Sequence, residues 1–317
     1  MWGFIFLLNM QNILLKDYNK ERVNLNINDL LIYGRKYLLN DDIENKPLKI
    51  RLLLEHVLHM NTYELVINHT QEIDKYKIEN FKQGLEKLKN NVPIQYITNN
   101  QEFMKMNFYV DENVLIPQPD TEILVESVIN YCENINNNYI LNTIPSAKIK
   151  ILDLCTGSGA IAISLAKYIE NCEITATDIS VKAIQIAKLN AEKNLVHKKI
   201  NFIESDMFSN INEKDFDIIV SNPPYIETDT IKTLCKEVQK EPLIALDGGL
   251  DGLDFYKVII NTSSEFLRDF GKLFLEIGYN QKSKLFNLIN NSHTFTQPSC
   301  IQDLGGNDRV IICTKNK

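Results

Sequence analysis

The chain has 317 residues, of which 44% are hydrophobic and 24% are charged. It is therefore long enough for two domains of ordinary size, and its composition is typical of a soluble globular protein. The 34 basic and 41 acidic residues give a formal net charge of −7, which argues against a broad electrostatic interface with nucleic acid. The six cysteines form no C-x-x-C pair and no cysteine–histidine cluster at zinc spacing. We therefore expect free thiols, a reducing cytoplasmic compartment and no bound metal.

The first residues are apolar, with the sequence Met-Trp-Gly-Phe-Ile-Phe-Leu-Leu at positions 1–8. This run is too short to span a bilayer, and it lacks the basic region and small-residue cleavage site of a signal peptide. We expect neither a membrane anchor nor a secretion signal at this end of the sequence.

Residues from about 24 to 90 have the apolar spacing of packing helices. Segments 28–38, 49–60 and 78–88 each carry a one-faced apolar stripe, and Asn28 is placed to cap the first of them. The histidines of this region lie on or near the same helices, so we interpret them as structural or solvated rather than metal-binding. Residues 1–92 are predicted to form a small helical domain that docks a partner.

Short β-rich runs separated by polar turns follow between Pro93 and Pro117. The runs fall at residues 96–98, 103, 107–110 and 114–116. They predict a hairpin-like linker over residues 93–117. A helix from Thr121 to about Asn130 is expected next, followed by a loose polar loop to Ser146.

From residue 148 onward, strand patterns alternate with helix patterns. Strands are predicted at 149–154, 173–178, 200–203, 216–220, 272–277 and 309–313, with a further one near Cys300, and helices at 160–168 and 181–193. Such alternation predicts an α/β fold with a doubly wound, mainly parallel sheet covered on both faces. Residues 118–317 are assigned to this domain.

A glycine-rich loop, Asp-Leu-Cys-Thr-Gly-Ser-Gly at positions 153–159, joins the first of these strands to its helix. Gly157 and Gly159 allow the backbone to approach a ligand at a helix N-terminus. Asp178 ends the second strand, 19 residues after Gly159, where its carboxylate can accept hydrogen bonds from both hydroxyls of a ribose. The order D-x-x-x-G-x-G differs from the G-x-G-x-x-G of nicotinamide cofactors. It better suits S-adenosylmethionine, a nucleoside with no pyrophosphate.

Asp206 and Met207 follow the third strand and are expected to flank the adenine, although core packing is the alternative for Met207 taken alone. The predicted cofactor-binding residues are Asp153, Cys155, Thr156, Gly157, Ser158, Gly159, Asp178, Asp206, Met207 and Asn222.

A second motif, Asn222-Pro223-Pro224-Tyr225, ends the apolar strand at 216–220. Two successive prolines make a stiff turn at the carboxyl end of a strand, where ligands bind in open α/β sheets. The Asn222 side-chain oxygen and the Pro223 carbonyl can each accept one N–H of a planar amino group, while Tyr225 stacks on its plane. We predict that Asn222, Pro223 and Tyr225 are catalytic and that these three, with Pro224, bind the substrate. The alternative is an ordinary proline-punctuated exit from a strand.

Together these motifs resemble the class I S-adenosylmethionine-dependent methyltransferases and, within them, the HemK/PrmC family. The resemblance covers nearly the whole chain beyond about residue 25, and it includes residues 93–98, 115–122, 151–162, 220–226, 241–242, 251–256, 303–304 and 307–310. It implies a seven-stranded sheet and methyl transfer to the side-chain nitrogen, N5, of a glutamine. That glutamine lies in the Gly-Gly-Gln motif of peptide chain release factors, which would be the protein partners. Neither stable nucleic acid binding nor membrane association is expected.

The chain departs from the family pattern at two positions. Cys155 stands where the family loop usually has glycine, and it introduces strain if the backbone there needs a positive φ. Gln118-Pro119-Asp120-Thr121 replaces the usual Arg-Pro-Glu-Thr, so a charge that could matter in binding is lost. Neither change touches Asn222 or Asp178, and activity is still expected.

Three alternatives remain open from the sequence. The Asn-Pro-Pro-Tyr motif is shared with adenine-N6 nucleic acid methyltransferases, although that function requires base flipping and a basic channel. A ribosomal-protein glutamine methyltransferase has the same chemistry with a different acceptor. A non-catalytic module that only binds a translation factor is the third, supported by Cys155 alone.

Overall fold

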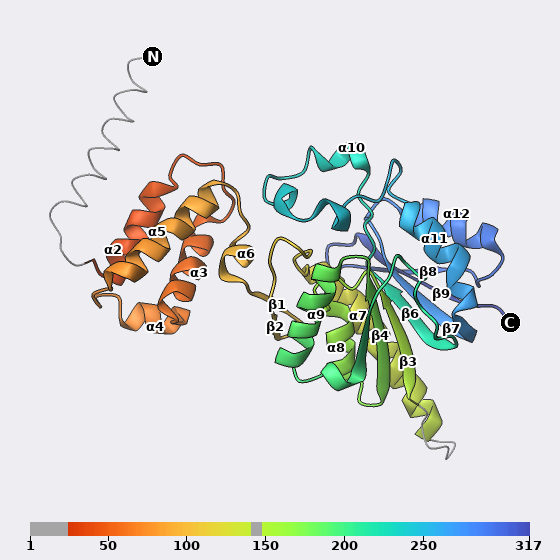
Figure 1. The fold of residues 1–317 in the computed structure, drawn as a ribbon. Helices are drawn as coiled ribbons and strands as arrows, with labels where there is room; N and C mark the ends of the chain where they lie inside the picture. Colours follow the sequence, from red (N-terminus) through yellow and green to blue (C-terminus); the bar gives the residue numbers. More distant parts are fainter. Residues whose placement is uncertain (1–24, 141–147) are drawn as a thin grey trace. The chain divides into compact units, whose positions relative to one another are not determined.

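The computed structural model describes residues 25–140 and 148–317. The predictions for the apolar run at 1–8 and for residues 141–146 lie outside this part. The chain divides into two compact units, Met1–Thr98 and Asn99–Lys317, so most of the predicted linker belongs to the second unit (Figure 1). Within the described ranges, no helix is both long enough and apolar enough to cross a membrane.

The first unit is helical, as the apolar spacing predicts. Its helices are α2 (Ile27–Tyr37), α3 (Lys46–Leu58), α4 (Thr62–Ile67), α5 (Lys75–Lys89) and α6 (Ile94–Thr98). Their apolar faces share one core, in which Leu30, Leu54 and Phe81 are fully buried. Gly84 lets α5 approach α3 closely, because a Cβ atom at this position would collide with Leu53.

Two predictions within this region are wrong. The N-cap of α2 is Asn26 and not Asn28, because the Asn26 side chain accepts a backbone N–H of the first turn at 2.9 Å in a reciprocal capping box. Residues 96–98 belong to helix α6 and do not form a strand. The Pro93 carbonyl accepts the N–H groups of the third and fourth residues after it, so this proline begins a helical turn and not an extended run.

The second unit begins with an antiparallel hairpin of β1 (Gln101–Phe103) and β2 (Met106–Phe108). A seven-stranded sheet of order β5-β4-β3-β6-β7-β9-β8 follows. Its strands are β3 (Ile149–Leu154), β4 (Cys172–Asp178), β5 (Ile200–Glu204), β6 (Phe216–Ser221), β7 (Leu267–Glu276), β8 (Ser299–Gln302) and β9 (Asp308–Thr314). Strands β3 to β7 pair in parallel, whereas β9 is antiparallel to both β7 and β8. The predicted mainly parallel, seven-stranded sheet is thereby confirmed.

Helices cover both faces of this sheet (Figure 1). The helices of the second unit are α7 (Pro119–Ile140), α8 (Ala160–Tyr168), α9 (Val181–Lys193), α10 (Thr228–Ile231), α11 (Asp254–Thr262) and α12 (Lys282–Ser292), with short 3-10 turns at His197–Lys199, Val238–Lys240, Leu243–Ala245 and Ser263–Glu265. Apolar residues of α7, α8 and α9 form one buried layer with the sheet, and those of α11 and α12 form the other. Strands buried on both faces explain the continuous apolar runs in the sequence.

Two boundaries differ from the prediction by several residues, and one predicted strand is absent. The helix expected to end near Asn130 continues to Ile140. The rings of Tyr131 and Phe274 lie 5.8 Å apart, so α7 still packs against β7 directly beyond the predicted end. Residues 114–116 form no strand, since the Ile116 N–H is bound instead by the Glu241 carboxylate at 2.9 Å. Strand β7 also starts earlier than predicted, at Leu267.

The strand order predicts that a ligand site lies at the carboxyl ends of β3 and β6. Strand β3 pairs with β4 on one side and with β6 on the other. The chain therefore leaves these neighbouring strands in different directions at their carboxyl ends, which opens a crevice where ligands bind in such sheets. Both motifs singled out in the sequence follow directly after β3 and β6.

Candidate active site

A cavity of about 230 Å³ lies at this edge of the sheet. Of the predicted site residues, the cavity is lined by Cys155, Gly157, Asp178, Asp206, Met207, Asn222 and Pro224. It is not lined by Asp153, Thr156, Ser158, Gly159, Pro223 or Tyr225. The structure therefore brings part of each motif to a common cavity, whereas Asp153, Thr156 and Ser158 of the loop are buried beside it.

The two glycines of the loop have different environments. Gly157 has φ +55°, and a Cβ atom there would meet nothing within 4 Å, so its backbone faces open space in the cavity. Gly159 has φ +82°, and a Cβ atom there would lie 3.1 Å from the Ala187 Cβ atom. Gly157 thus leaves room for a ligand, whereas Gly159 allows α8 and α9 to pack closely.

Cys155 adopts φ +60°, the left-handed conformation in which glycine is favoured. The expected strain is therefore present in the backbone. The Cys155 Sγ atom lies 3.9 Å from the Met207 Sδ atom, across the cavity wall. Burial raises the pKa of the Cys155 thiol well above its ordinary value, so the side chain is a neutral thiol.

Asp153 supports the loop from behind. It is fully buried, and its carboxylate accepts a hydrogen bond from the Thr156 hydroxyl at 2.6 Å. The Thr156 backbone N–H donates to the Thr177 carbonyl at 2.9 Å, which ties the loop to β4. Burial raises the pKa of Asp153 to about 7, although the Thr156 hydroxyl lowers it. These contacts hold the loop in shape.

Asp178 occupies the end of β4 with both oxygens engaged. Its carboxylate accepts the Gly157 N–H at 2.9 Å through one oxygen and the Ser180 N–H at 2.9 Å through the other. Burial raises the pKa of Asp178, and these backbone donors oppose that shift. Each oxygen keeps a further lone pair for a ligand hydroxyl. Asp178 therefore both shapes the loop and presents a carboxylate to the cavity.

The sequence did not indicate several of the cavity-lining residues. Leu115 comes from the segment after the hairpin, Ile179 follows β4, and Ile244 and Phe255 come from the chain between β6 and β7. Ile179 and Ile244 are each about half exposed. These residues give the cavity apolar walls. Leu115 and Phe255 lie in segments that carry the family resemblance, whereas no motif or spacing marks Ile179 or Ile244 in the sequence.

The Asn-Pro-Pro-Tyr turn is enclosed by residues distant in the sequence. A Cβ atom at Gly248 would lie 2.7 Å from the Tyr225 Cα atom, and one at Gly252 would lie 2.5 Å from the Tyr225 carbonyl oxygen. Burial raises the pKa of Tyr225 to about 12, so its phenol is neutral at ordinary pH. Only glycine at positions 248 and 252 permits this close approach.

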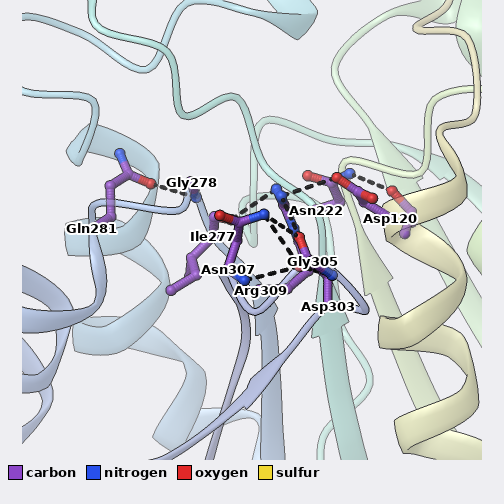
Figure 2. Close-up of polar contacts among 10 residues, drawn as sticks. Asp120, Asn222, Ile277, Gly278, Gln281, Asp303, Gly305, Asn307 and Arg309 are labelled. Atoms are coloured by element: carbon purple, nitrogen blue, oxygen red, sulfur yellow. Dashed lines mark hydrogen bonds and ion pairs between the residues drawn. The ribbon is translucent and has the colours of Figure 1, made fainter.

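Gln281 joins three chain segments around the same turn. Its Nε2 group donates to the Tyr225 carbonyl at 3.0 Å and to the Gly252 carbonyl at 3.1 Å, and its Oε1 atom accepts the Gly278 N–H at 2.9 Å. Gln281 is buried, and Figure 2 shows its contact with Gly278. This side chain therefore fixes the path of the backbone directly after the two prolines.

A polar network lies on the other side of Asn222 (Figure 2). The Asn222 Nδ2 atom donates to the Thr121 hydroxyl at 3.2 Å. Arg309 forms ion pairs with Asp120 at 2.9 Å and with Asp303 at 3.1 Å. This network connects the start of α7, the end of β6 and the β8–β9 turn.

Residues Gln118 to Thr121 make contacts on two sides of this network. Gln118, which replaces the usual arginine, donates through Nε2 to the Ile116 carbonyl at 3.0 Å. Asp120 pairs with Arg309 and Thr121 contacts Asn222. Asp120 and Thr121 thus take part in the network beside Asn222, while Gln118 makes a local backbone contact.

Glu276, the last residue of β7, is buried next to this network. Burial raises the pKa of Glu276 to about 7, although the nearby polar groups of Thr121 and Asn222 and the charge of Arg309 lower it. One carboxylate oxygen, Oε2, has no hydrogen-bond partner among the described residues. Glu276 was not singled out in the sequence, because a carboxylate at the end of an apolar strand has no local signature.

Comparison with known proteins identifies the family. A model of the PrmC N-terminal domain matches residues 29–98, and a model of the methyltransferase small domain matches residues 135–249. The release factor glutamine methyltransferase of Clostridium botulinum is 39% identical over 292 residues, which cover 91% of this chain and 99% of that protein. This chain belongs to the release factor glutamine methyltransferase family.

Other relatives agree with that assignment, and one solved structure shares the fold. The release factor glutamine methyltransferase of Clostridium acetobutylicum is 36% identical, covering 92% of this chain and 99% of that protein. The release factor glutamine methyltransferase of Fusobacterium nucleatum is 38% identical, covering 95% of this chain and 80% of that protein. The hMettl16 catalytic domain is similar in fold, with a TM-score of 0.50, 14% identity and coverage of 78% of this chain and 84% of that one. The suspected HemK/PrmC resemblance is confirmed.

Proposed function

We propose that this member of the release factor glutamine methyltransferase family transfers a methyl group from S-adenosylmethionine to the N5 amide of the Gly-Gly-Gln glutamine in peptide chain release factors. The observation that carries the proposal is the single cavity lined by both Asp178 and Asn222. One end offers a carboxylate suited to a ribose, and the other offers a carboxamide suited to a planar NH2 group.

The residues present fit S-adenosylmethionine. Asp178 has lone pairs for two ribose hydroxyls, and Gly157 leaves a space that any larger side chain would fill. Ile179 and Met207 provide apolar walls for an adenine ring. When bound, the cofactor supplies an electrophilic sulfonium methyl group.

Asn222 and Pro223 are suited to orient the acceptor amide. An amide nitrogen is a weak nucleophile, because its lone pair is delocalised into the carbonyl. As that nitrogen gains positive charge, its N–H groups become stronger donors, so the Asn222 side-chain oxygen and the Pro223 carbonyl bind the transition state more tightly than the ground state. Tyr225 remains a neutral phenol and can stack on the amide plane. No strong general base is required, because the cationic amide formed when its nitrogen accepts the methyl group is acidic enough to lose a proton to water.

Several features favour a protein acceptor over a nucleic acid base. The cavity lining includes no lysine or arginine among the described residues, whereas binding of nucleic acid depends on basic groups that contact phosphates. The six cysteines are free thiols, which fits a reducing, cytoplasmic location where translation takes place. We assign docking of the release factor to the helical first unit.

The test is the Asn222→Ala variant. We expect its turnover on an intact release factor to fall at least about 100-fold, as for loss of one transition-state contact in other enzymes, while its affinity for S-adenosylmethionine in calorimetry stays near wild type. Asn201→Ala, an exposed substitution on β5 outside this cavity, is the matched control. An Asn222→Ala variant with wild-type turnover would contradict the assignment.

A further inference from the structure

We propose that Thr121 is a positioning residue that, together with Glu276, fixes which way round the Asn222 carboxamide lies. This inference rests on the proposed function, since it concerns how Asn222 meets the acceptor amide. It assigns a role to two residues that neither bind the cofactor nor form part of the Asn-Pro-Pro-Tyr turn.

The sheet register brings these groups together. Ser221 of β6 pairs with Leu275 of β7, so the next residues along the two parallel strands, Asn222 and Glu276, emerge side by side. Thr121 lies in the first turn of α7, with its hydroxyl 3.2 Å from the Asn222 Nδ2 atom. Thr121 and Glu276 are only 5% and 2% exposed, so their polar groups depend on partners within the protein.

The chemistry of the three groups gives the hydrogen bonds a direction. An ionised carboxylate only accepts hydrogen bonds, and a threonine hydroxyl has a single proton to donate. The Thr121 hydroxyl and the Asn222 carboxamide both lie close enough to the Glu276 carboxylate to lower its pKa, and a carboxylate beside the Thr121 hydroxyl attracts the hydroxyl proton. The Thr121 oxygen is then left to accept from the Asn222 NH2 group.

This direction leaves the Asn222 side-chain oxygen available to the acceptor. One N–H group of the carboxamide is donated to Thr121 at 3.2 Å, and the nearby Glu276 carboxylate also favours the NH2 end on this side. If the carboxamide were turned by 180°, its NH2 group would face the NH2 group of the acceptor glutamine, and two donors would oppose each other. The positioning contacts therefore exclude the unproductive orientation, as supporting hydrogen bonds do for groups in other sites.

The ion pairs of Arg309 keep the neighbourhood in place. Arg309 holds Asp120, the residue before Thr121, and its charge also favours the ionised form of Glu276. Asp120 is half exposed at the side chain, whereas the Arg309 side chain is 11% exposed. The start of α7 is thus fastened to β9 on one side of Thr121.

The experiment compares Thr121→Val, which keeps the shape of the side chain but removes the hydroxyl, with Thr121→Ser, which keeps the hydroxyl. Both are assayed on an intact release factor at about pH 8.5, where a carboxyl of pKa near 7 is ionised. We expect Thr121→Val to lower kcat roughly 10- to 100-fold, the range found when an orienting hydrogen bond is removed from a functional group. The Kd for S-adenosylmethionine and the KM for the release factor should change less than about threefold, and Thr121→Ser should recover most of kcat.

Two further variants complete the design. Glu276→Gln replaces one acceptor oxygen by a donor and should lower kcat in the same way, while Thr233→Val, at an exposed threonine outside the network, should leave kcat unchanged. Wild-type kcat in Thr121→Val would overturn the positioning role, as would a Thr121→Ser variant as defective as Thr121→Val. A wild-type protein that leaves the glutamine unmethylated would instead overturn the proposed function, and the positioning role with it.

Discussion

The two glycines of the cofactor loop should respond in opposite ways to the same substitution. Gly157 and Gly159 both have a positive φ, but a Cβ atom at Gly157 meets open space, whereas one at Gly159 meets Ile163 at 2.9 Å and Ala187 at 3.1 Å. Gly157→Ala should therefore block ligand binding with little loss of stability. Gly159→Ala should destabilise the protein, because its methyl group has no room between α8 and α9.

The magnitudes follow from the two environments. A left-handed conformation costs alanine about 1–2 kcal/mol, and the lower entropy of the unfolded alanine chain returns about 0.4–1 kcal/mol, which leaves about 1 kcal/mol for Gly157→Ala. Gly159→Ala adds about 1–3 kcal/mol of overpacking, for a total of about 2–4 kcal/mol. At about 2–4 °C per kcal/mol for a unit of this size, the Tm should fall by about 2–4 °C for Gly157→Ala and by about 4–16 °C for Gly159→Ala.

Two assays separate these effects. Thermal unfolding followed by circular dichroism gives the Tm of each variant, and calorimetric titration with S-adenosylmethionine at a temperature where both are folded gives the Kd. We expect Gly157→Ala to raise the Kd at least about tenfold, which corresponds to about 1.4 kcal/mol. Wild-type cofactor binding by Gly157→Ala would show that Gly157 does not face the ligand. A Gly159→Ala variant as stable as Gly157→Ala would show that α8 and α9 have room for a methyl group at this position.

Three further changes probe the surroundings of the cavity. Asp178→Asn should raise the Kd for S-adenosylmethionine at least about tenfold in calorimetry, because one of its two acceptor oxygens becomes a donor; an unchanged Kd would remove Asp178 from the cofactor site. Gln281→Met should lower the free energy of unfolding by about 2–4 kcal/mol in urea titrations, since the Tyr225 and Gly252 carbonyls lose a buried donor. A loss below about 1 kcal/mol would show that Gln281 does not hold this turn. Burial raises the pKa of Glu241 to about 7 from an ordinary 4.5. Between these pH values the folded state therefore holds a proton that the unfolded state releases. The corresponding contribution to the free energy of unfolding, about 3 kcal/mol, is present below pH 4.5 and is lost as the pH rises through 7. Glu241→Gln should flatten the decline in stability between about pH 5 and 8, and an unaltered profile would count against the buried carboxyl.

Much of the fold follows from local patterns in the sequence. The α8 and α9 boundaries agree with the predicted segments because each helix follows a loop with clear signals, glycine before α8 and a serine N-cap before α9. Buried parallel strands such as β3 and β6 are evident as continuous apolar runs. The continuation of α7 beyond Asn130 could not be predicted in this way, since the contact between Tyr131 and Phe274 of β7 joins residues far apart in the sequence.

The candidate site was only partly predictable for a related reason. Spacing indicates that Asp178 and Asn222 reach one edge of the sheet, but it does not say which side of a loop a side chain faces. Asp153 and Thr156 therefore turn out to support the loop from inside. The Thr121–Asn222 contact joins residues 101 positions apart, and no local pattern reports such a pairing.

Methylation of the release factor glutamine is measured most directly as methyl transfer from labelled S-adenosylmethionine. Three acceptors are compared: a release factor with an intact Gly-Gly-Gln motif, the same factor with that glutamine changed to alanine, and DNA in single-stranded and duplex form. We predict label on the intact factor alone. Label on DNA, or equal label on the alanine-substituted factor, would contradict the account.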